Sequence, residues 1–283
     1  MRLKLFWGIG FLFLVSSSAF GWNSTGHMLI ADIALKHLRK NVKEVCESLL
    51  QNMPAKEANT FIDCAPWADD VRTRKTASWH YIDLYFSADG TPNNLQPRHK
   101  NVVWAIKKFT EQLKNKSLPT TMRANALRYL IHFVGDIHQP LHCCSRITRQ
   151  LPYGDKGGND FFFSHPSANN PRPHELHYLW DEGGGLFKYM QRPIDQNSRN
   201  FLDYLARRAM RTLTSSEIQH ELKITRPLDW AKEGQAIAQK FVYATPEYHE
   251  PSSNYILLVQ HISLQRCAIA GLRLAHLLNQ IIK

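Results

Sequence analysis

The chain has 283 residues, of which 43% are hydrophobic, and its 35 lysines and arginines against 24 acidic residues give a formal net charge of +11. No internal repeat, low-complexity tract or interdomain linker is visible, which excludes a repeat array, and the length suffices to bury a sizeable core. An excess of basic residues is typical of proteins that bind a polyanion such as nucleic acid or an anionic surface, although an ordinary solvated face explains it equally well.

The first 21 residues predict a secretory signal peptide. Arg2 and Lys4 precede the apolar stretch LFWGIGFLFLV, and the small residues Ala19 and Gly21 follow at the positions that a signal peptidase reads. The apolar part is too short for a membrane span, and no later stretch is expected to reach the length needed to cross a bilayer. Cleavage after Gly21 would release a mature domain, residues 22–283, that is secreted or periplasmic and begins with the free α-amino group of Trp22.

Apolar residues recur at three- and four-residue spacing along most of this mature part, which predicts a single, mainly α-helical domain. Short strands are expected at 81–86 and 160–164. The Pro-, Gly- and Asn-rich stretch 151–173 is typical of a long functional loop. The predicted helical segments are 27–40, 102–114, 121–138, 201–213, 230–244 and 255–282.

Export permits disulfide bonds, and the odd number of cysteines leaves at least one of them unpaired. The short loop between Cys46 and Cys64 favours a bridge there, although the connectivity cannot be read from sequence. Cys143 and Cys144 follow His142 directly and are most simply two packed thiols, with a vicinal disulfide or adventitious zinc binding as alternatives. The five cysteines are Cys46, Cys64, Cys143, Cys144 and Cys267.

The stretch HFVGDIHQPLH carries the first group of candidate metal ligands. His132 and Asp136 are four residues apart and therefore lie on one face of a helix. Pro140 ends that helix, after which the chain reaches His142. Two ligand types on one helical face can hold one metal ion.

The stretch LHYLWDEGG repeats this spacing with His177 and Asp181. Imidazole together with carboxylate is the ligand mixture of a hydrolytic zinc site, whereas a structural zinc site more often uses cysteines. One such pair is more often an ordinary surface pair, but two pairs and a further histidine predict a metal site. PWADDVR and SWHYID add Asp69 and His80, which alone would be a helix N-cap and a core histidine and become ligands only in combination.

In these motifs the sequence resembles the zinc-dependent single-strand-specific nucleases and 3′-nucleotidases of the P-one/S-one type, found in fungi, plants, protozoa and bacteria. The resemblance covers nearly the whole mature chain and rests on many motifs in the same order. They are Trp22-x-x-x-Gly26-His27, Trp67-Ala68-Asp69, His80-Tyr81-Ile82-Asp83, the stretch from His132 to His142, Gly157-Gly158-Asn159, His177-Tyr178-Leu179-Trp180-Asp181 and the C-terminal AGLRLAHLLN.

The resemblance implies a single, largely α-helical domain whose cleft holds three zinc ions. It implies Asp69, His80, His132 and Asp136 as ligands of the first ion. It assigns the second to the Trp22 amine and carbonyl, His27 and the bridging Asp136, and the third to His142, His177 and Asp181.

The resemblance also implies how the site would act. Two zinc ions roughly 3.5–4 Å apart lower the pKa of a shared water, and the third ion contacts the phosphate and the leaving 3′-oxygen. With Asp69 and Asp136, the implied catalytic residues are Arg72, which neutralises charge on the phosphate, and Asn159, which orients it. Without the resemblance, Asn159 would be an ordinary turn residue.

Base recognition is implied at Tyr81, a stacking aromatic, and at Asp83, an acceptor for the edge of the base. Stacking requires an unpaired base, which accounts for a preference for single strands. Without the resemblance, a tyrosine beside a histidine is most often a core residue.

Asn23 departs from the glycine that many relatives have after the first tryptophan, and the site tolerates it only if its side chain points away from the metals. Asn23-Ser24-Thr25 is also a glycosylation sequon. A glycan there would obstruct the metal cluster, which favours a source that does not glycosylate at this position, such as a bacterium.

The leading hypothesis is an exported zinc phosphodiesterase that cleaves single-stranded RNA and DNA to 5′-nucleotides and removes the phosphate of 3′-nucleotides. A zinc phospholipase C, a group that shares the tri-zinc constellation, is the first alternative, and a non-enzymatic exported zinc-binding protein is the second. Tyr81, Asp83 and the basic charge favour the nuclease. No obligate protein partner is implied, and a monomer is expected.

Overall fold

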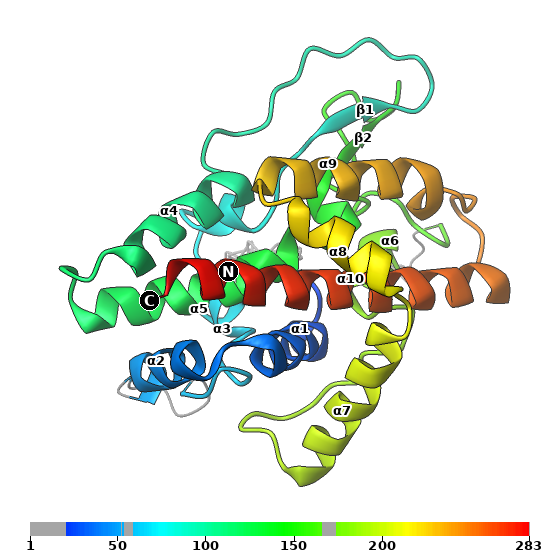
Figure 1. Cartoon of the computed structure of the whole chain (residues 1–283). Coiled ribbons are helices and arrows are strands. Elements are labelled where there is room, and N and C mark those ends of the chain that lie inside the picture. The colour runs from blue at the N-terminus through cyan, green and yellow to red at the C-terminus, as the bar shows by residue number, and fades with distance from the viewer. Residues whose placement is uncertain (1–20, 52, 54–58, 166–173, 283) are drawn as a thin grey trace, which may run out of the picture.

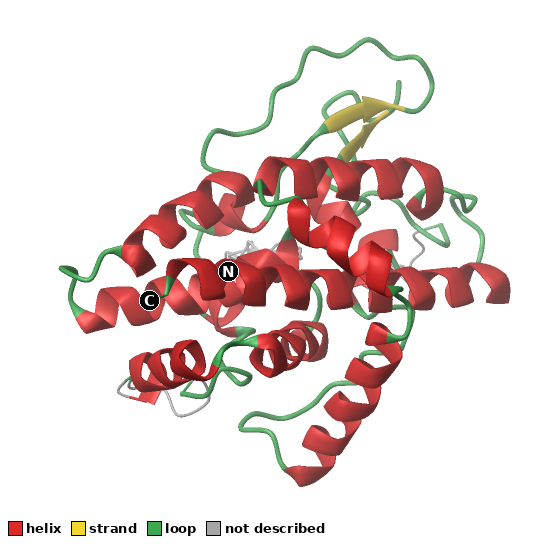
Figure 2. Cartoon of the chain, in the orientation of Figure 1, coloured by secondary structure: helices red, strands yellow, loops and turns green. Residues whose placement is uncertain are grey.

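The computed structural model describes residues 21–51, 53, 59–165 and 174–282. The predicted signal peptide lies outside the described residues except for Gly21, and so does part of the predicted loop, residues 166–173. The fold is mainly α-helical, as predicted (Figure 2). The helices are α1 Ser24–His37, α2 Lys40–Gln51, α3 Trp67–Asp70, α4 Val102–Lys114, α5 Thr120–Asp136, α6 Leu176–Asp181, α7 Gln196–Met210, α8 Ser215–Lys223, α9 Pro227–Ile237 and α10 Ser253–Ile281.

Short elements complete the described chain. Two 3₁₀ turns, η2 (Ala77–His80) and η3 (Pro140–Cys143), lie close to candidate metal ligands, and a π-helical turn, η4 (Ala238–Val242), continues α9. The strands β1 (Tyr85–Ser87) and β2 (Ser145–Ile147) form a parallel two-stranded sheet in which Tyr85 is paired with Ser145.

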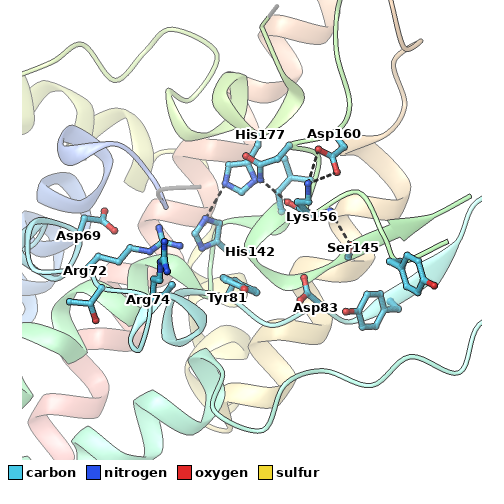
Figure 3. A pocket seen from close by; sticks show the side chains of 16 residues that line it. Asp69, Arg72, Arg74, Tyr81, Asp83, His142, Ser145, Lys156, Asp160 and His177 are labelled. Carbon is cyan, nitrogen blue, oxygen red and sulfur yellow. Dashed lines mark hydrogen bonds and ion pairs between the residues drawn. The ribbon is translucent and has the colours of Figure 1, made fainter. Parts of the chain in front are cut away.

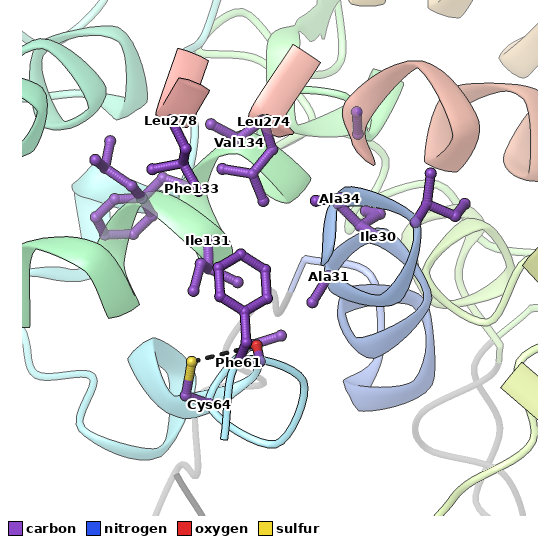
Figure 4. Close-up of a cluster of buried hydrophobic side chains, with 14 of the residues drawn as sticks. Ile30, Ala31, Ala34, Phe61, Cys64, Ile131, Phe133, Val134, Leu274 and Leu278 are labelled. Atoms are coloured by element: carbon purple, nitrogen blue, oxygen red, sulfur yellow. Dashed lines mark hydrogen bonds between the residues drawn. The ribbon is translucent and has the colours of Figure 1, made fainter. Parts of the chain in front are cut away.

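The core forms where α1, α5 and α10 meet. Figure 1 shows α10 running across the molecule between α9 and α1. Gly271 of α10 permits close approach to α1, because a Cβ there would lie only 2.6 Å from Cγ2 of Ile33. Aliphatic and aromatic side chains of the three helices converge in one cluster (Figure 4), which includes Ile30, Ala31, Ala34, Ile131, Phe133, Val134, Leu274 and Leu278. This rigid core positions α5, which carries two of the candidate ligands.

The predicted helical segments agree with α4, α5 and α10 to within a few residues. The predicted segment 27–40 corresponds to α1, which ends earlier, at His37, because Leu38 adopts an extended backbone. The helix that follows, α2, was not predicted. The helix α8 was not predicted. Its apolar stripe is limited to Ile218 and Leu222, which are half-buried, and a capping box between Thr214 and Glu217 holds its start.

The strand predictions were partly right. The segment 81–86 contains the start of β1, but residues 160–164 form no strand and contribute a single antiparallel bridge between Phe162 and Glu175. Residues 151–165 form a series of turns. These short extended segments depend on partners that are distant in the sequence.

The predicted Cys46–Cys64 disulfide is wrong, because all five cysteines are free and buried. Burial raises the pKa of the Cys46 thiol to about 12. The Cys64 thiol donates a hydrogen bond to the Phe61 carbonyl, 3.4 Å away (Figure 4). Both thiols therefore behave as small apolar groups of the core. Cys143 and Cys144 are packed thiols as well, and each donates to a backbone carbonyl.

The expectation that no later stretch reaches the length needed to cross a bilayer was wrong. The helix α10 is long and apolar enough by length and composition, but 67% of its apolar window is buried inside the protein. It also carries Arg266 and Arg273, both buried and ion-paired with Glu233 of α9. The core helix of a soluble protein can be as long and as apolar as a membrane span, so α10 is weak evidence for a membrane span.

Candidate active site

A cavity of about 710 Å³ opens beside the C-terminal end of α5. Its wall comes from the segment after α3, from η2 and β1, from the start of β2 and from the glycine-rich turn. The candidate residues Asp69, Arg72, Tyr81, Asp83, His142, Asn159 and His177 line it. Sequence segments that are distant along the chain thus meet in one cavity.

The structure brings the histidine and aspartate side chains predicted as ligands into three groups. Within each group the ligand atoms lie within 4.8 Å of one another. Every member except Asp69 is buried, and the Asp69 side chain is only 11% exposed. The groups are His27, His132 and Asp136; Asp69, His80 and His132; and His142, His177 and Asp181.

Asp136 lies between two of these groups. Its Oδ2 atom is 3.1 Å from Nδ1 of His80 and 3.1 Å from Nε2 of His132. Its Oδ1 atom faces the other way, 3.4 Å from Nε2 of His27. The two oxygens of one carboxylate therefore face different imidazoles, which is the geometry of a ligand shared by two metal ions.

Backbone carbonyls fix the orientation of three imidazoles. Nδ1 of His132 donates to the Ala65 carbonyl at 2.8 Å, and Nδ1 of His142 donates to the His80 carbonyl at 2.7 Å. Nδ1 of His177 donates to the Gly157 carbonyl at 2.7 Å. Because a neutral imidazole has one N–H, each ring in its neutral form presents the Nε2 lone pair to its group, as a metal ligand must.

In the third group, this orientation creates a contact that two neutral imidazoles do not satisfy. Nε2 of His142 and Nε2 of His177 lie 3.2 Å apart (Figure 3), so that two lone pairs face each other. Oδ2 of Asp181 lies 3.4 Å from the same His177 nitrogen. A cation between these atoms would satisfy all three, so the donor set fits a metal ion.

Orphaned atoms in the other two groups lead to the same conclusion. Nε2 of His27, Oδ1 of Asp69 and Oδ1 of Asp136 are buried and have no hydrogen-bond partner. Leaving such atoms unsatisfied is expensive, and imidazole and carboxylate donors suit zinc. The residues therefore fit a bound metal in all three groups.

The ionisable side chains of these groups strongly affect one another's pKa values. Burial would raise the pKa of Asp136, but the charge of His132 and the neighbouring His27 and His80 imidazoles hold it well below the usual range. Burial would lower the pKa of His132, but Asp136 and Asp69 raise it well above normal. Burial, assisted by the charge of His132, lowers the pKa of His27 to about 4. The His27 imidazole is therefore neutral near pH 7 and can offer a lone pair to a metal ion.

Gln139 orients the third group and was missed in the sequence. Its Nε2 donates to Oδ1 of Asp181 at 2.6 Å, while its Oε1 accepts from the Leu141 backbone N–H. Burial is the main reason why the pKa of Asp181 is raised well above normal, and the Gln139 hydrogen bond opposes that rise. No spacing rule indicates this contact, because it joins the residue before η3 to the end of α6.

Trp22 anchors the predicted mature N-terminus beside α5. Its ring is fully buried, Nε1 donates to the Gly135 carbonyl at 3.1 Å, and Phe187 packs edge-on at 5.7 Å. Gly21 lies directly beside candidate ligands, because a Cβ on it would lie 1.8 Å from Oδ1 of Asp136 and 3.0 Å from Nε2 of His27. Gly21 therefore occupies space beside the first group.

Asn23 is directed away from these groups, as its tolerance requires. Its Oδ1 atom caps α1 by accepting from the backbone N–H groups of Thr25 and Gly26. Its Nδ2 atom donates to the Phe187 carbonyl at 2.6 Å. The nitrogen that a glycan would need is thus already engaged in the fold.

The phosphate-binding candidates lie on the cavity wall. Arg72 follows the last turn of α3, and Arg74, which was not predicted, lies beside it (Figure 3). Asn159 also lines the cavity, but one of its amide hydrogens is used in a 2.6 Å hydrogen bond to the Lys156 carbonyl. Two arginines and an amide therefore face the same space as His142 and His177.

The base-binding candidates lie beside this region. Figure 3 shows Arg72 and Arg74 on one side of Tyr81 and Asp83 on the other. Burial raises the pKa of Asp83 to about 6, with Arg98 opposing the rise and Asp155 adding to it. Asp83 is therefore an ionised acceptor at neutral pH and a protonated group in acid.

A helical domain with buried imidazole and carboxylate clusters, opening on a cavity lined by arginines, is typical of metal-dependent hydrolases that act on phosphate esters. The family model described as S1/P1 Nuclease matches residues 22–283. The chain therefore belongs to the S1/P1 nuclease family and is a hydrolase that acts on phosphodiester bonds.

Individual relatives agree with this assignment. Endonuclease 1 of Arabidopsis thaliana is 28% identical over 300 residues, which cover 96% of this chain and 91% of that protein. Nuclease P1 of Penicillium citrinum is 27% identical over 132 residues, 43% of this chain and 47% of its own length. Nuclease S1 of Aspergillus oryzae is 26% identical over 175 residues, 57% of this chain and 54% of its own length.

Proposed function

We propose that this protein is an exported, zinc-dependent endonuclease that cleaves single-stranded RNA and DNA to 5′-nucleotides and also removes the phosphate of 3′-nucleotides. The observation that carries the proposal is the position of Asp136, whose two carboxylate oxygens face different imidazoles. A shared carboxylate is the means by which two metal ions are held close enough to act on one phosphate.

The proposed cofactor is three zinc ions per chain. Asp69, His80, His132 and Asp136 would hold the first, and the Trp22 amine and carbonyl with His27 and Asp136 the second. His142, His177 and Asp181 would hold the third. When bound, the ions supply Lewis-acid activation of water and neutralise charge on the phosphate and the leaving oxygen.

The chain's own residues would position the substrate. Arg72 and Asn159 bind the phosphate oxygens, and the planar guanidinium of Arg72 suits a phosphate in particular. Water attacks phosphorus, the bond from phosphorus to O3′ breaks, and the products carry a 5′-phosphate and a 3′-hydroxyl. Arg72 stabilises the charge that builds on the non-bridging oxygens during this displacement.

Tyr81 and Asp83 would hold the nucleoside on the 3′-oxygen side of the scissile bond. Tyr81 stacks on its base, which must be unpaired, and ionised Asp83 accepts a hydrogen bond from the edge of the base. This arrangement supports a preference for single strands. It also supports activity on a 3′-nucleotide, which contains everything that the two residues contact.

Removal of residues 1–21 as a signal peptide is part of the proposal. It would deliver the protein to the periplasm or the exterior as a domain of residues 22–283, which we expect to be a monomer without an obligate partner. The position of Gly21 against Asp136 and His27 supports cleavage before Trp22 as an activating step, because it clears space beside both ligands.

The alternatives fit the site less well. A phospholipase C has no use for a tyrosine and an acceptor placed to hold a base, and the net charge of +11 suits a polyanion. A non-enzymatic zinc-binding protein leaves the arginines on the cavity wall without a purpose.

Purified protein that begins at Trp22 and is loaded with zinc should hydrolyse single-stranded DNA, RNA and 3′-AMP, and should hydrolyse a phosphocholine ester much more slowly. Failure on all three nucleotide substrates would refute the proposed function. Faster turnover of the phosphocholine ester would favour the phospholipase.

A further inference from the structure

Two tyrosines in the cavity have no role in the proposed function. Tyr85 and Tyr153 line the same cavity as Tyr81. The Tyr85 phenol is close enough to Asp83, Tyr81 and Arg98 for their charges to influence its pKa, which burial raises. Tyr85 therefore lies near Tyr81 and Asp83, at the base-binding end of the cavity.

Strand geometry directs Tyr85 into the cavity. Successive side chains of a strand point to opposite faces, and the next residue, Phe86, packs edge-on against Tyr243 in the core at 5.5 Å. Tyr85 is paired in register with Ser145, which also lines the cavity. The ring is therefore fixed on the open face of the two-stranded sheet.

Tyr153 lies at the tip of a tight turn held by backbone hydrogen bonds. The Gly154 N–H donates to the Leu151 carbonyl at 3.0 Å, and the Asp155 N–H donates to the Arg146 carbonyl at 3.0 Å. The Arg146 N–H in turn donates to Oδ1 of Asp155 at 2.9 Å. The backbone that carries Tyr153 is thus closely tied to β2.

Gly154 brings this turn against Tyr85. Its φ of +92° is a conformation that other residues rarely adopt, and a Cβ there would lie 3.2 Å from Cε1 of Tyr85. The turn that carries Tyr153 therefore lies next to Tyr85, and Tyr153 itself is 82% exposed. A large apolar ring that is exposed on a tethered turn at a cavity rim is suited to stack on a ligand.

We propose that Tyr153, with Tyr85, forms a second stacking platform that binds the base of the nucleotide on the 5′ side of the one held by Tyr81. The inference rests on the proposed function, which places the 3′-phosphate of the first nucleoside beside Arg72. The strand then leaves that sugar through its 5′-oxygen, away from Arg72, toward Asp83 and Tyr85. The preferred substrate is accordingly a strand of at least two nucleotides before the scissile phosphate.

The direct test compares two substrates. One is 3′-TMP, and the other is the thymidine dinucleotide 3′-phosphate with a methylphosphonate internal linkage, so that inorganic phosphate is released only from the 3′ end. The ratio of kcat/KM for the dinucleotide to that for 3′-TMP should fall about 5- to 150-fold in Tyr153→Ala, the usual loss for one stacked base. Tyr153→Phe, which keeps a stacking ring, should retain most of the ratio.

Tyr189 provides a matched control, because it is 83% exposed but does not line the cavity. Tyr189→Ala should leave the ratio unchanged. An unchanged ratio in Tyr153→Ala, an equal loss in Tyr189→Ala, or a Phe variant as weak as the Ala variant would each overturn the platform.

Calorimetric binding separates this inference from the proposed function. The ligands are the 3′-methylenephosphonate analogues of the same mononucleotide and dinucleotide, in which carbon replaces the leaving oxygen. The wild type should bind the dinucleotide more tightly than the mononucleotide, and Tyr153→Ala should lose that advantage. Equal affinities in the wild type would overturn the platform, whereas a wild type that shows the advantage but releases no phosphate would refute only the proposed activity.

Discussion

The two ends of the cavity are built differently. At the metal-site end, seven of the eight clustered histidine and aspartate side chains are buried, and backbone carbonyls fix three of the imidazoles. At the base-binding end, Tyr81 and Tyr85 are half-buried and Tyr153 is almost fully exposed. The first end is suited to one geometry, and the second can accept bases of different size and shape.

The contrast indicates where substitutions should be tolerated. A buried group of coupled charges fails as a unit when one member is removed, because the remaining charges are left unpaired in a medium that penalises them. An open stacking surface loses only the contribution of the ring removed. The metal-site end should therefore decide whether the protein acts, and the base-binding end how tightly it holds a given strand.

Asp136→Ala should have the largest effect. It removes both oxygens between the first two groups, so the variant should lose zinc and all activity on single-stranded DNA. Elemental analysis and a nuclease assay measure both losses. Asp32→Asn is a suitable control, because Asp32 is equally buried but pairs with Lys36 and Arg199 on another face of α1. Full zinc content in Asp136→Ala would contradict the role of Asp136 as a ligand shared by two metal ions.

Retaining Gly21 should have the second largest effect. A chain with even one residue before Trp22 has a peptide bond where the free amine is needed, and Gly21 then lies against Asp136 and His27. Zinc content and activity should both drop sharply relative to the chain that starts at Trp22. A tag after the C-terminus is the matched control, and equal activity of the two N-termini would count against the ligand role of Trp22.

Asp83→Asn should change stability in a pH-dependent way. Because the folded pKa of about 6 lies above the usual value of 3.8, ionised Asp83 destabilises the fold above pH 6, and this cost disappears below pH 4. The free energy of unfolding of the variant, relative to that of the wild type, should therefore be about 3 kcal/mol higher at pH 8 than at pH 4. Urea denaturation at matched zinc concentrations measures this, and an equal difference at both pH values would contradict the burial of Asp83.

Gln139→Leu should weaken the third metal group without removing a ligand. Loss of the hydrogen bond to Asp181 should reduce metal affinity or activity about 10- to 100-fold, as for other groups that orient a ligand. Zinc titration into stripped protein reports the affinity. Gln260→Leu is the control, since Gln260 donates to the Gly184 carbonyl rather than to a candidate ligand, and similar losses in both variants would indicate a general structural effect.

Tyr81→Ala should have the smallest effect. Nucleotide binding should weaken by about 1–3 kcal/mol while zinc stays bound. The Michaelis constant for 3′-AMP reports the loss, and Tyr81→Phe should restore binding. An unchanged Michaelis constant would mean that the ring only packs against the protein.

Much of the helical fold could be predicted, because apolar stripes mark α4, α5 and α10 and i,i+4 spacing places His132 with Asp136 and His177 with Asp181. The pairing of β1 with β2 could not, since three-residue strands have no signal apart from their partner. The buried free thiols of Cys46 and Cys64 were mistaken for a bridge, because sequence spacing carries no information on the surrounding core.

The candidate site could also be predicted in part from the sequence. Residue types and motif order indicated which side chains meet, and the structure brings them together, while their roles as ligands remain predictions. The carbonyls that orient the imidazoles, the amide of Gln139 and the position of Tyr153 depend on contacts between distant segments. These features could be found only from the folded chain.

The most direct test of the proposed three-zinc cluster is a count of bound metal on protein whose N-terminus has been sequenced. Chains that begin at Trp22 should carry three zinc ions each. One zinc ion or none on such chains, under conditions in which they cleave single-stranded DNA, would contradict the proposed cluster.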